Sequence, residues 1–130
     1  MRILIAEDDY ASRKSISRFL QKYGEVDITV DGMEAVKAFR YALEDGEYYD
    51  LVCLDIMMPY LDGIKVLQMI REMEEKIALP EERCAKVIMT TAINDAEQVR
   101  AAFEYGCEGY VAKPIDLEAF HKVLEKMGMV

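Results

Sequence analysis

The sequence predicts an α/β fold in which five parallel strands form an open, doubly wound sheet with helices on both faces. Three observations support this prediction: short apolar runs of strand length, helical periodicity between them, and regular alternation of the two along the chain. Because five strand–helix units are too few for the usual eight-stranded barrel, the sheet should stay open. Such sheets bind ligands beyond the carboxyl ends of their strands.

Four of the five expected strands are continuous apolar runs, which indicates burial on both faces of the sheet. The other run alternates apolar and polar residues, as expected at a sheet edge. Polar or turn-forming residues bound each run, so each ends within strand length. The buried runs are Ile3–Ala6, Leu51–Leu54, Val87–Met89 and Tyr110–Ala112, and the alternating run is Val26–Val30.

The segments between the strands repeat apolar residues every three or four positions, which places those residues on one face of a helix. Gly24 and Gly106 should end the first and fourth helices, and Asp116 should cap the start of the fifth. The segment Glu72 to Lys86 is open to two interpretations, a longer third helix or a loop around Pro80. The apolar positions are Ile16, Phe19, Leu20 and Tyr23; Val36, Phe39 and Leu43; Val66, Leu67, Ile70 and Met73; Val99, Ala102 and Phe103; and Leu117, Phe120, Leu124 and Met127.

The composition is that of a soluble globular protein, with 52% hydrophobic and 32% charged residues among 130. No linker or repeat divides the chain, so we expect residues 1–130 to form a single domain with no output domain. The formal net charge of -9 repels nucleic acid and anionic membranes, and no apolar stretch is long enough for a signal peptide or membrane span. Three widely spaced cysteines indicate neither a disulfide framework nor a zinc site and fit a cytoplasmic location.

Charged and hydroxyl side chains stand directly after the expected buried strands. Because parallel strands end at the same edge of a sheet, these side chains should converge there. An acidic run after the first strand would repel a nucleotide's phosphates unless a cation intervened. Carboxylates without a nearby histidine suit a hard cation, so we expect Mg²⁺, with Mn²⁺ as the alternative. The residues are Glu7, Asp8 and Asp9; Asp55; Thr90 and Thr91; and Lys113.

Asp55 is the expected nucleophile of this constellation, because a carboxylate can accept a phosphoryl group covalently. It follows the apolar run Leu51–Leu54 directly and therefore needs a partner for its charge, for which Lys113 is the candidate. The hydroxyl of Thr91 and the ammonium of Lys113 could hold the oxygens of the transferred group. Thr90 remains an alternative to Thr91, because a slip of one residue moves the hydroxyl to the opposite face.

Four motifs that occur in order along the chain resemble the response-regulator receiver domains of two-component signalling. Each motif is weak by itself, but four in order on the expected strand ends make a specific signal that covers almost the whole chain. The motifs are Glu7-Asp8-Asp9, Leu54-Asp55-Ile56-Met57-Met58-Pro59 with Asp62-Gly63 downstream, Thr91-Ala92, and Gly109-Tyr110-Val111-Ala112-Lys113-Pro114.

The resemblance implies the flavodoxin-like strand order 2-1-3-4-5, which is the order described for the chemotaxis receiver. It implies that Asp55 receives its phosphoryl group from a histidine kinase or a histidine phosphotransfer protein. The domain would catalyse its own phosphorylation and dephosphorylation without acting as an enzyme on other substrates. The downstream partner would be another protein, and a monomer is expected, with phosphorylation-dependent dimerisation left open.

The resemblance also implies how the site is assembled. Asp8 and Asp9 would bind the metal ion together with Asp55 and the backbone carbonyl of Met57. The peptide bond between Lys113 and Pro114 would be cis and would aim the lysine inward.

The resemblance further implies a switch. Thr91 would move toward the phosphoryl group while Tyr110 turns from an exposed to a buried position, and this would change the face formed by the fourth helix, fifth strand and fifth helix. In similar receiver domains, the residues two positions past the acceptor and two positions past the hydroxyl residue tune the rate of dephosphorylation. These positions are Met57 and Ile93, whose apolar side chains cannot orient a water, so slow self-dephosphorylation is expected.

Three other functions are weighed against this one. A magnesium-dependent phosphatase with an aspartyl nucleophile would be expected to carry a second aspartate where Met57 stands. A flavin carrier of the same fold needs a hydroxyl- or glycine-rich phosphate loop after the first strand, where the acidic run stands. An interaction module that works without phosphorylation would have no need of an intact acceptor, hydroxyl and lysine.

Overall fold

The computed structural model describes residues 1–92 and 96–130 and confirms the expected fold. Five parallel strands form one sheet in the order β2-β1-β3-β4-β5. Within the described residues, no helix combines the length and apolar character needed to cross a membrane. The elements are β1 Arg2–Ala6, α1 Tyr10–Leu20, β2 Glu25–Thr29, α2 Gly32–Asp45, β3 Leu51–Asp55, α3 Gly63–Lys76, the 3₁₀ turn η1 Glu81–Arg83, β4 Lys86–Thr91, α4 Ala96–Glu104, β5 Gly109–Ala112 and α5 Leu117–Lys126.

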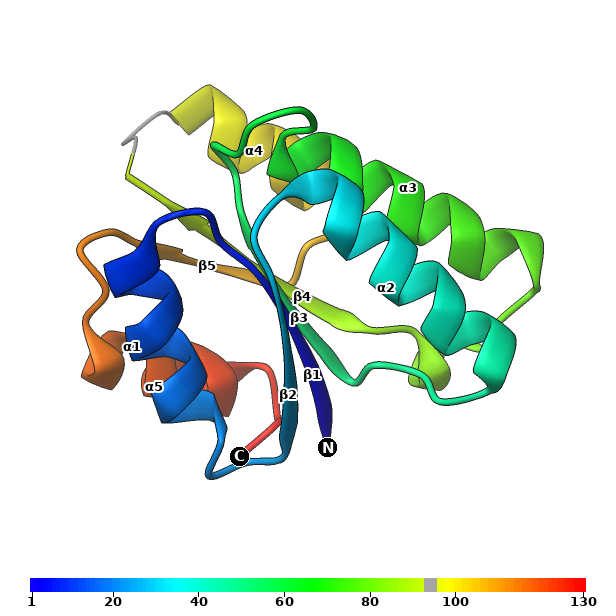
Figure 1. Ribbon diagram of the computed structural model, residues 1–130, viewed down its shortest axis with the longest axis horizontal. Coiled ribbons are helices and arrows are strands. Elements are labelled where there is room, and N and C mark those ends of the chain that lie inside the picture. Colours follow the sequence, from blue (N-terminus) through cyan, green and yellow to red (C-terminus); the bar gives the residue numbers. More distant parts are fainter. Residues whose placement is uncertain (93–95) are drawn as a thin grey trace.

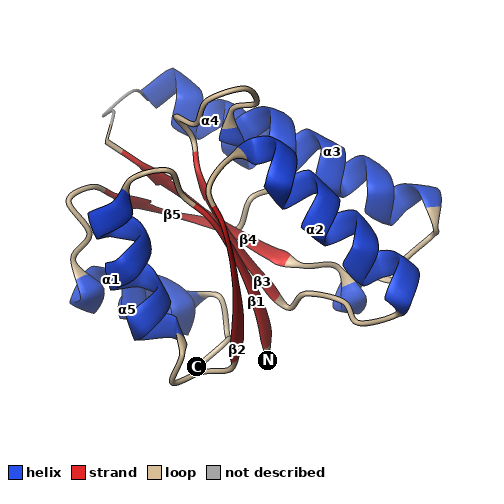
Figure 2. Ribbon diagram, in the orientation of Figure 1, coloured by secondary structure: helices blue, strands red, loops and turns tan. Residues whose placement is uncertain are grey.

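Helices cover both faces of the sheet, α1 and α5 on one side and α2, α3 and α4 on the other (Figure 1, Figure 2). Successive side chains of a strand point to opposite faces of the sheet, so each central strand contributes residues to two separate cores. Ile3 and Ile5 of β1 pack with Phe120 on the α1/α5 side. Leu4 and Ala6 of the same strand join the core on the other side. The middle residues of the central strands are therefore apolar and buried on both faces of the sheet, as the sequence pattern predicted.

The edge strands differ from the central strands in their exposure. β2 is a flanking strand that, among the described residues, pairs with β1 alone, in register from Arg2 with Glu25 to Ala6 with Thr29. Its position at the sheet edge is the one predicted, and most of its side chains are exposed, but burial does not follow the alternation, because Ile28 is exposed and Thr29 is buried. β5 is the other edge and pairs with β4.

The prediction that Gly24 ends the first helix was wrong, because α1 already ends at Leu20. A side chain at Gly24 would collide with the main-chain carbonyl of Met1, so the glycine permits a close approach of two chain segments. Tyr23 lies in the turn beyond the helix, yet it still packs against the α1/α5 core.

The other helix ends follow the sequence more closely. Gly106 adopts a positive φ of 97° after α4, a conformation that favours glycine. Asp116 caps α5 by accepting a hydrogen bond from the main-chain N–H of Glu118 at 2.9 Å. In the segment that the sequence left open, α3 continues to Lys76, and η1 follows Pro80 before β4 begins.

Candidate functional site

The carboxyl ends of the strands bring the chemically active side chains to one edge of the sheet. Asp55 is the last residue of β3 and lies opposite Thr90 in the ladder, and Thr91 lies opposite Ala112 of β5. Glu7 follows β1 directly, and Lys113 follows β5 directly. The arrangement joins residues from four strands because all of these strands run in the same direction.

Lys113 forms the centre of the charged cluster. Its Nζ lies 3.0 Å from Oδ2 of Asp55 and 2.6 Å from Oε1 of Glu7. Both carboxylates are buried, with residue exposures of 2% and 1%, so each needs a partner for its charge. Burial alone would lower the pKa of Lys113, but its contacts with the negatively charged carboxylates of Glu7 and Asp55 outweigh that effect and raise it. The lysine therefore stays charged.

The Asp55 carboxylate is held at both oxygens. Its Oδ1 accepts a hydrogen bond from the main-chain N–H of Met57 at 3.2 Å, and its Oδ2 accepts one from Lys113. Burial and the neighbouring carboxylate of Glu7 raise its pKa to about 6, although Lys113 acts in the opposite direction. The site therefore presents a desolvated carboxylate next to an ammonium.

Glu7 has a buried oxygen without a hydrogen-bond partner. Its Oε2 accepts a hydrogen bond from the main-chain N–H of Asp9 at 3.1 Å. Its Oε1 is in ion-pair contact with Lys113, but that contact lacks hydrogen-bond geometry, so this buried oxygen makes no hydrogen bond. A buried carboxylate oxygen without a hydrogen bond is costly, and a second cation beside the Lys113 ammonium would lower that cost.

Three carboxylates gather closely enough to hold a metal ion. Glu7, Asp8 and Asp55 each offer one oxygen, and these oxygens all lie within 4.8 Å of one another. Burial and the nearby Asp55 raise the pKa of Asp8, as expected for acids that repel one another. An all-oxygen donor set fits a hard divalent cation such as Mg²⁺, and so does the Oε1 of Glu7, which has an ion-pair contact but no hydrogen bond.

Asp9 does not join this group, which differs from the expected metal ligands. Its Oδ2 accepts a hydrogen bond from the main-chain N–H of Ser12 at 2.9 Å and so caps the start of α1. This capping bond lowers the pKa of Asp9. The third carboxylate of the cluster comes from Glu7, whereas the sequence had led us to expect Asp9.

A signal for Glu7 was present in the sequence. Ile3 and Ile5 face the α1/α5 core, and continuing their alternation by one more step places Glu7 on that same face. Cys53 also faces that core, so the same rule places Asp55 beside Glu7. This alternation therefore separates Glu7, which shares a face with Asp55, from Asp9, which caps α1.

The loop that follows Asp55 is fixed by close main-chain contacts. A side chain at Gly63 would collide with the main-chain carbonyl of Asp55, so glycine lets α3 begin directly against the end of β3. The N–H of Gly63 donates to the carbonyl of Ile56 at 2.9 Å, and the carboxylate of Asp62 caps α3. These contacts position the residues that follow Asp55.

The remaining site residues lie around this cluster. Thr91 is 3% exposed, whereas Tyr110 is 40% exposed. The alternation of β4 and β5 places both on the sheet face opposite Asp55 and Lys113, the face that α4 covers. The side chain of Met57 is exposed, and the peptide bond between Lys113 and Pro114 is cis. Ile93, the second position linked to dephosphorylation, lies outside the described residues.

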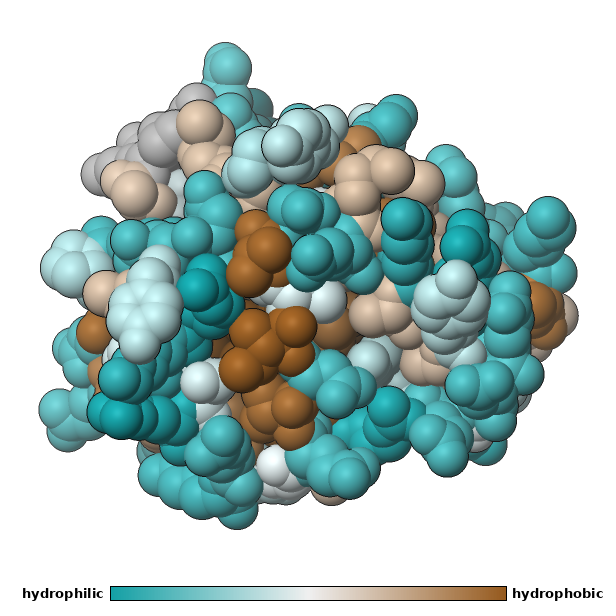
Figure 3. All heavy atoms as spheres, in the orientation of Figure 1, coloured by the Kyte–Doolittle hydropathy of each residue, from teal (hydrophilic) through white to brown (hydrophobic). Residues whose placement is uncertain are grey.

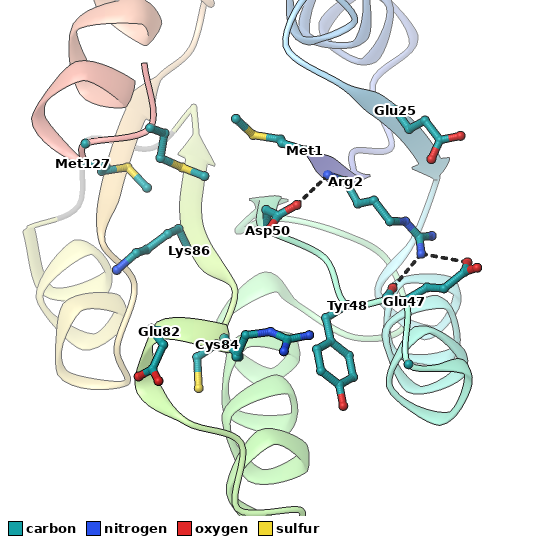
Figure 4. Close-up of a pocket in the computed structure, with 14 residues that line it drawn as sticks. Met1, Arg2, Glu25, Glu47, Tyr48, Asp50, Glu82, Cys84, Lys86 and Met127 are labelled. Carbon is teal, nitrogen blue, oxygen red and sulfur yellow. Dashed lines mark hydrogen bonds and ion pairs between the residues drawn. The ribbon is translucent and has the colours of Figure 1, made fainter.

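A groove of about 860 Å³ lies at the opposite end of the sheet and takes no part in this chemistry. Arg2 already pairs there with Asp50 through its main-chain N–H and with Glu47 through its guanidinium (Figure 4). Charged groups that satisfy one another leave little for a ligand to recognise. The chemically distinctive site is therefore the acidic cluster at the carboxyl end.

Comparisons with known proteins agree with this fold. The family model of the response regulator receiver domain matches residues 3–125. Chemotaxis protein CheY of Treponema pallidum is 34% identical over 131 residues, which cover 99% of this chain and 81% of that protein. Hybrid signal transduction histidine kinase L of Dictyostelium discoideum is 32% identical over 128 residues, 98% of this chain but only 7% of the kinase.

Two solved structures resemble the fold closely. The CheX–CheY–BeF3–Mg²⁺ complex from Borrelia burgdorferi has a TM-score of 0.83 at 25% identity and covers 98% of this chain and 89% of that one. The complex of the Saccharomyces cerevisiae histidine phosphotransfer protein Ypd1 with the receiver domain of Ssk1 has a TM-score of 0.81 at 25% identity. The latter match covers 100% of this chain and 92% of that one.

Proposed function

This chain belongs to the response regulator receiver domain family, and we propose that it is a signalling switch that accepts a phosphoryl group on Asp55. The observation that carries this proposal is the buried Asp55 carboxylate, 3.0 Å from the Lys113 ammonium and within the acidic cluster. A buried carboxylate beside a fixed cation is poised for phosphoryl transfer, which depends mainly on positioning and charge stabilisation.

The proposed donor is a phosphohistidine of a histidine kinase or histidine phosphotransfer protein. An oxygen of Asp55 forms the new P–O bond while the P–N bond to the donor imidazole breaks, and the electron pair of that bond stays on the nitrogen. The imidazole, whose other ring nitrogen carries a proton taken from water, leaves as the neutral base. Lys113 stays charged and stabilises the negative oxygens of the transferred group. The yeast complex of Ypd1 with the Ssk1 receiver supports a donor of this class.

The proposed metal ligands are Glu7, Asp8 and Asp55, together with the backbone carbonyl of Met57. We replace Asp9 by Glu7 in this set because the Asp9 carboxylate caps α1. Mg²⁺ in this position would neutralise negative charge on the phosphoryl oxygens, and Mn²⁺ would serve as a substitute. The presence of Mg²⁺ in the Borrelia complex supports this choice.

The proposed switch couples Thr91 and Tyr110. These residues belong to neighbouring strands and share one face of the sheet, with Thr91 two residues beyond Met89, which lies opposite Tyr110. Phosphorylation adds about 1.5 to 2 negative charges beside the end of β4, which could draw the Thr91 hydroxyl toward the new group. Tyr110, now partly exposed, would then turn inward and alter the α4–β5–α5 face for a protein partner.

The wider cellular setting is also part of the proposal. We place the protein in the cytoplasm because Cys53, Cys84 and Cys107 are all unpaired, as expected in a reducing compartment. We also propose that residues 1–130 work as one domain that acts through other proteins, with self-dephosphorylation as its own off step. The exposed, apolar side chain of Met57 beside the acceptor disfavours the phosphatase alternative, which needs an acid or base at that place.

The test is phosphorylation of the purified protein by acetyl phosphate with Mg²⁺, followed by intact mass spectrometry. The parent should gain one phosphoryl group and Asp55→Ala none, while the control Asp45→Ala, at an exposed position near the end of α2, should behave as the parent. Equal labelling of Asp55→Ala, or no labelling of the parent with or without Mg²⁺, would overturn the proposal.

A further inference from the structure

Tyr60 is an aromatic residue in a strained turn of the loop between β3 and α3. Its φ is 70°, and the main-chain N–H of Leu61 donates to the carbonyl of Pro59 at 2.8 Å, so these residues form a tight turn with Tyr60 at its centre. Such a turn with a positive central φ is rare and strained, and a bulky side chain makes it less favourable still. Glycine adopts this conformation without steric cost. Folding alone therefore does not explain a tyrosine at this position.

The residues on either side hold the turn in place. Met58 is buried, and Leu61 packs against the core on the side of α2, α3 and α4. A side chain at Gly32, the first residue of α2, would collide with Leu61, so the loop is braced against that helix. Met58 and Leu61 are thus directed inward, whereas Tyr60 is 87% exposed. The turn therefore holds the ring of Tyr60 out in solvent.

The most exposed large hydrophobic side chains lie beside the acceptor. Among the described residues, Tyr60 at 87% and Tyr10 at 65% are the two most exposed, and Met57 is 52% exposed. Tyr10 begins α1 directly after the acidic run, and Met57 donates its main-chain N–H to Asp55. Figure 1 shows the start of α1 and the loop after β3 at the same end of the sheet. Tyr10, Met57 and Tyr60 therefore form an apolar rim beside an acceptor that is itself only 2% exposed.

We propose that Tyr60, together with this apolar rim, docks the protein that donates the phosphoryl group, an inference that rests on the proposed function of Asp55. Because Asp55 is buried, a phosphohistidine reaches it only when the surface that carries the histidine lies against the loops around the acceptor. Tyr60 projects from one of these loops, five residues past Asp55. A tyrosine that becomes covered on docking contributes a large contact area at a small cost in side-chain entropy, which is why tyrosine is enriched among the residues that dominate binding.

The strained turn gives Tyr60 its position before a donor arrives. A side chain on a preorganised loop loses less freedom on docking than one on a mobile loop, so a strained but fixed turn can favour association. Acetyl phosphate, by contrast, is small enough to enter the site without covering the ring. The solved complex of Ypd1 with the Ssk1 receiver supports a protein of the histidine phosphotransfer class as the occupant. Tyr60 thus distinguishes donors by the surface around their phosphohistidine.

Rates of phosphoryl transfer from two probes, acetyl phosphate and phosphorylated yeast Ypd1, test this proposal in the presence of Mg²⁺. Tyr60→Gly removes the ring and relieves the turn, so it should keep the parent's rate with acetyl phosphate and its stability to urea. With Ypd1 the same variant should lose about tenfold in kcat/KM, chiefly through a higher KM. Tyr60→Phe keeps the ring and should stay within about twofold of the parent with both probes.

Two variants at exposed positions away from the rim serve as controls. Tyr41→Ala is the matched control, since Tyr41 is 55% exposed and lies in the second half of α2. Ile28→Ala tests the apolar residues that gather over β2 in Figure 3, where Ile28 is 48% exposed. Both variants should accept phosphoryl groups from Ypd1 at the parent's rate.

The outcomes separate docking from chemistry. Equal Ypd1 rates in the parent and Tyr60→Gly, including no transfer to either, would overturn the docking role alone. So would the same loss in Tyr41→Ala or Ile28→Ala, which would place the contact elsewhere. A loss in Tyr60→Gly that is equal for both probes would show that Tyr60 acts on the site itself, which also contradicts docking. A parent that acetyl phosphate does not label would overturn the proposed function and this inference with it.

Discussion

The two ends of the sheet hold buried charges in opposite ways. At the amino end, the guanidinium of Arg71 bonds the carboxylates of Glu74 and Glu108 at 2.8 and 3.0 Å. The same guanidinium donates to the main-chain carbonyls of Ala85 at 2.8 Å and Gly106 at 2.6 Å. The second oxygen of Glu74 accepts from the N–H of Ala85 at 2.7 Å. This end forms a network in which donors and acceptors are matched.

At the carboxyl end the matching is incomplete. Three carboxylates, those of Glu7, Asp8 and Asp55, crowd together beside the ammonium of Lys113. One buried oxygen of Glu7 lacks a hydrogen bond, and the pKa of Asp55 is raised to about 6. A matched network stabilises a fold, whereas an unmatched one stores repulsion that a ligand can relieve. The difference between the two ends therefore separates structural charges from functional ones.

Removing the cation at the matched end should have the largest effect on stability. Arg71→Met leaves the buried Glu74 charge and two carbonyls without their partner, so the free energy of unfolding should fall by about 3–5 kcal/mol. Urea denaturation followed by circular dichroism measures this change. The control Arg100→Met, at an exposed position on α4, should change the free energy of unfolding by less than about 0.5 kcal/mol. Equal losses in the two variants would contradict a special role for the network.

Removing the charge of Asp55 at the carboxyl end should increase the free energy of unfolding, whereas removing Arg71 should decrease it. The folded-state pKa of Asp55 is raised from 3.8 to about 6, so the stability supplied by its protonated form is present below pH 3.8 and lost as pH rises through about 6. In metal-free protein at about pH 7.5, Asp55→Asn should therefore raise the free energy of unfolding by about 1–3 kcal/mol.

This gain should shrink toward zero at about pH 4, where Asp55 in the parent is largely protonated and resembles asparagine. The groups that face Asp55 are Glu7 and Asp8 after β1 and Lys113 after β5, and all three remain in the variant. Urea denaturation at both pH values in the presence of a chelator makes the comparison. A variant less stable than the parent at about pH 7.5 would show that attraction by Lys113 outweighs the repulsion.

The assignment of Glu7 in place of Asp9 can be tested by metal affinity. Glu7→Gln removes a ligand charge and should weaken Mg²⁺ binding about tenfold, measured by isothermal titration calorimetry. Asp9→Ser keeps a residue that can cap α1 and should leave the affinity unchanged. The reverse order of the two effects would restore Asp9 as the ligand.

Met57 should give the smallest effect. Replacing it by asparagine supplies a group that can orient a water beside the acceptor, so phosphate loss should accelerate about threefold to tenfold. Phosphate release from the phosphorylated protein measures this rate. Met33→Asn is a matched control, because Met33 is 50% exposed and Met57 is 52% exposed. An unchanged rate in Met57→Asn would count against slow self-dephosphorylation caused by the apolar side chain.

Most of the fold and much of the site could be predicted from local sequence patterns. Asp55 and Lys113 were expected to meet because each follows a buried run, and parallel strands end at one edge. The division of the acidic run was not predicted, because Glu7 and Asp9 are both acids after the same strand. What distinguishes the candidate ligand Glu7 from the helix cap Asp9 is the direction of each side chain and the position at which α1 begins.

The error at Gly24 has a different cause. A glycine after an apolar helical repeat is typical of a helix end, but this glycine makes room for the carbonyl of Met1. That contact joins segments distant in the sequence, and helical periodicity carries no information about it. Contacts of this kind depend on how the strands are placed beside one another.

Locating the phosphoryl group chemically tests most directly whether Asp55 is the acceptor. After phosphorylation with acetyl phosphate and Mg²⁺, borohydride reduction converts an acyl phosphate of aspartate to homoserine, and peptide mass spectrometry identifies the position. Our account predicts conversion at Asp55 alone, with Glu7 and Asp8 unchanged. Conversion at either of those residues, or phosphorylated protein without any converted carboxylate, would contradict it.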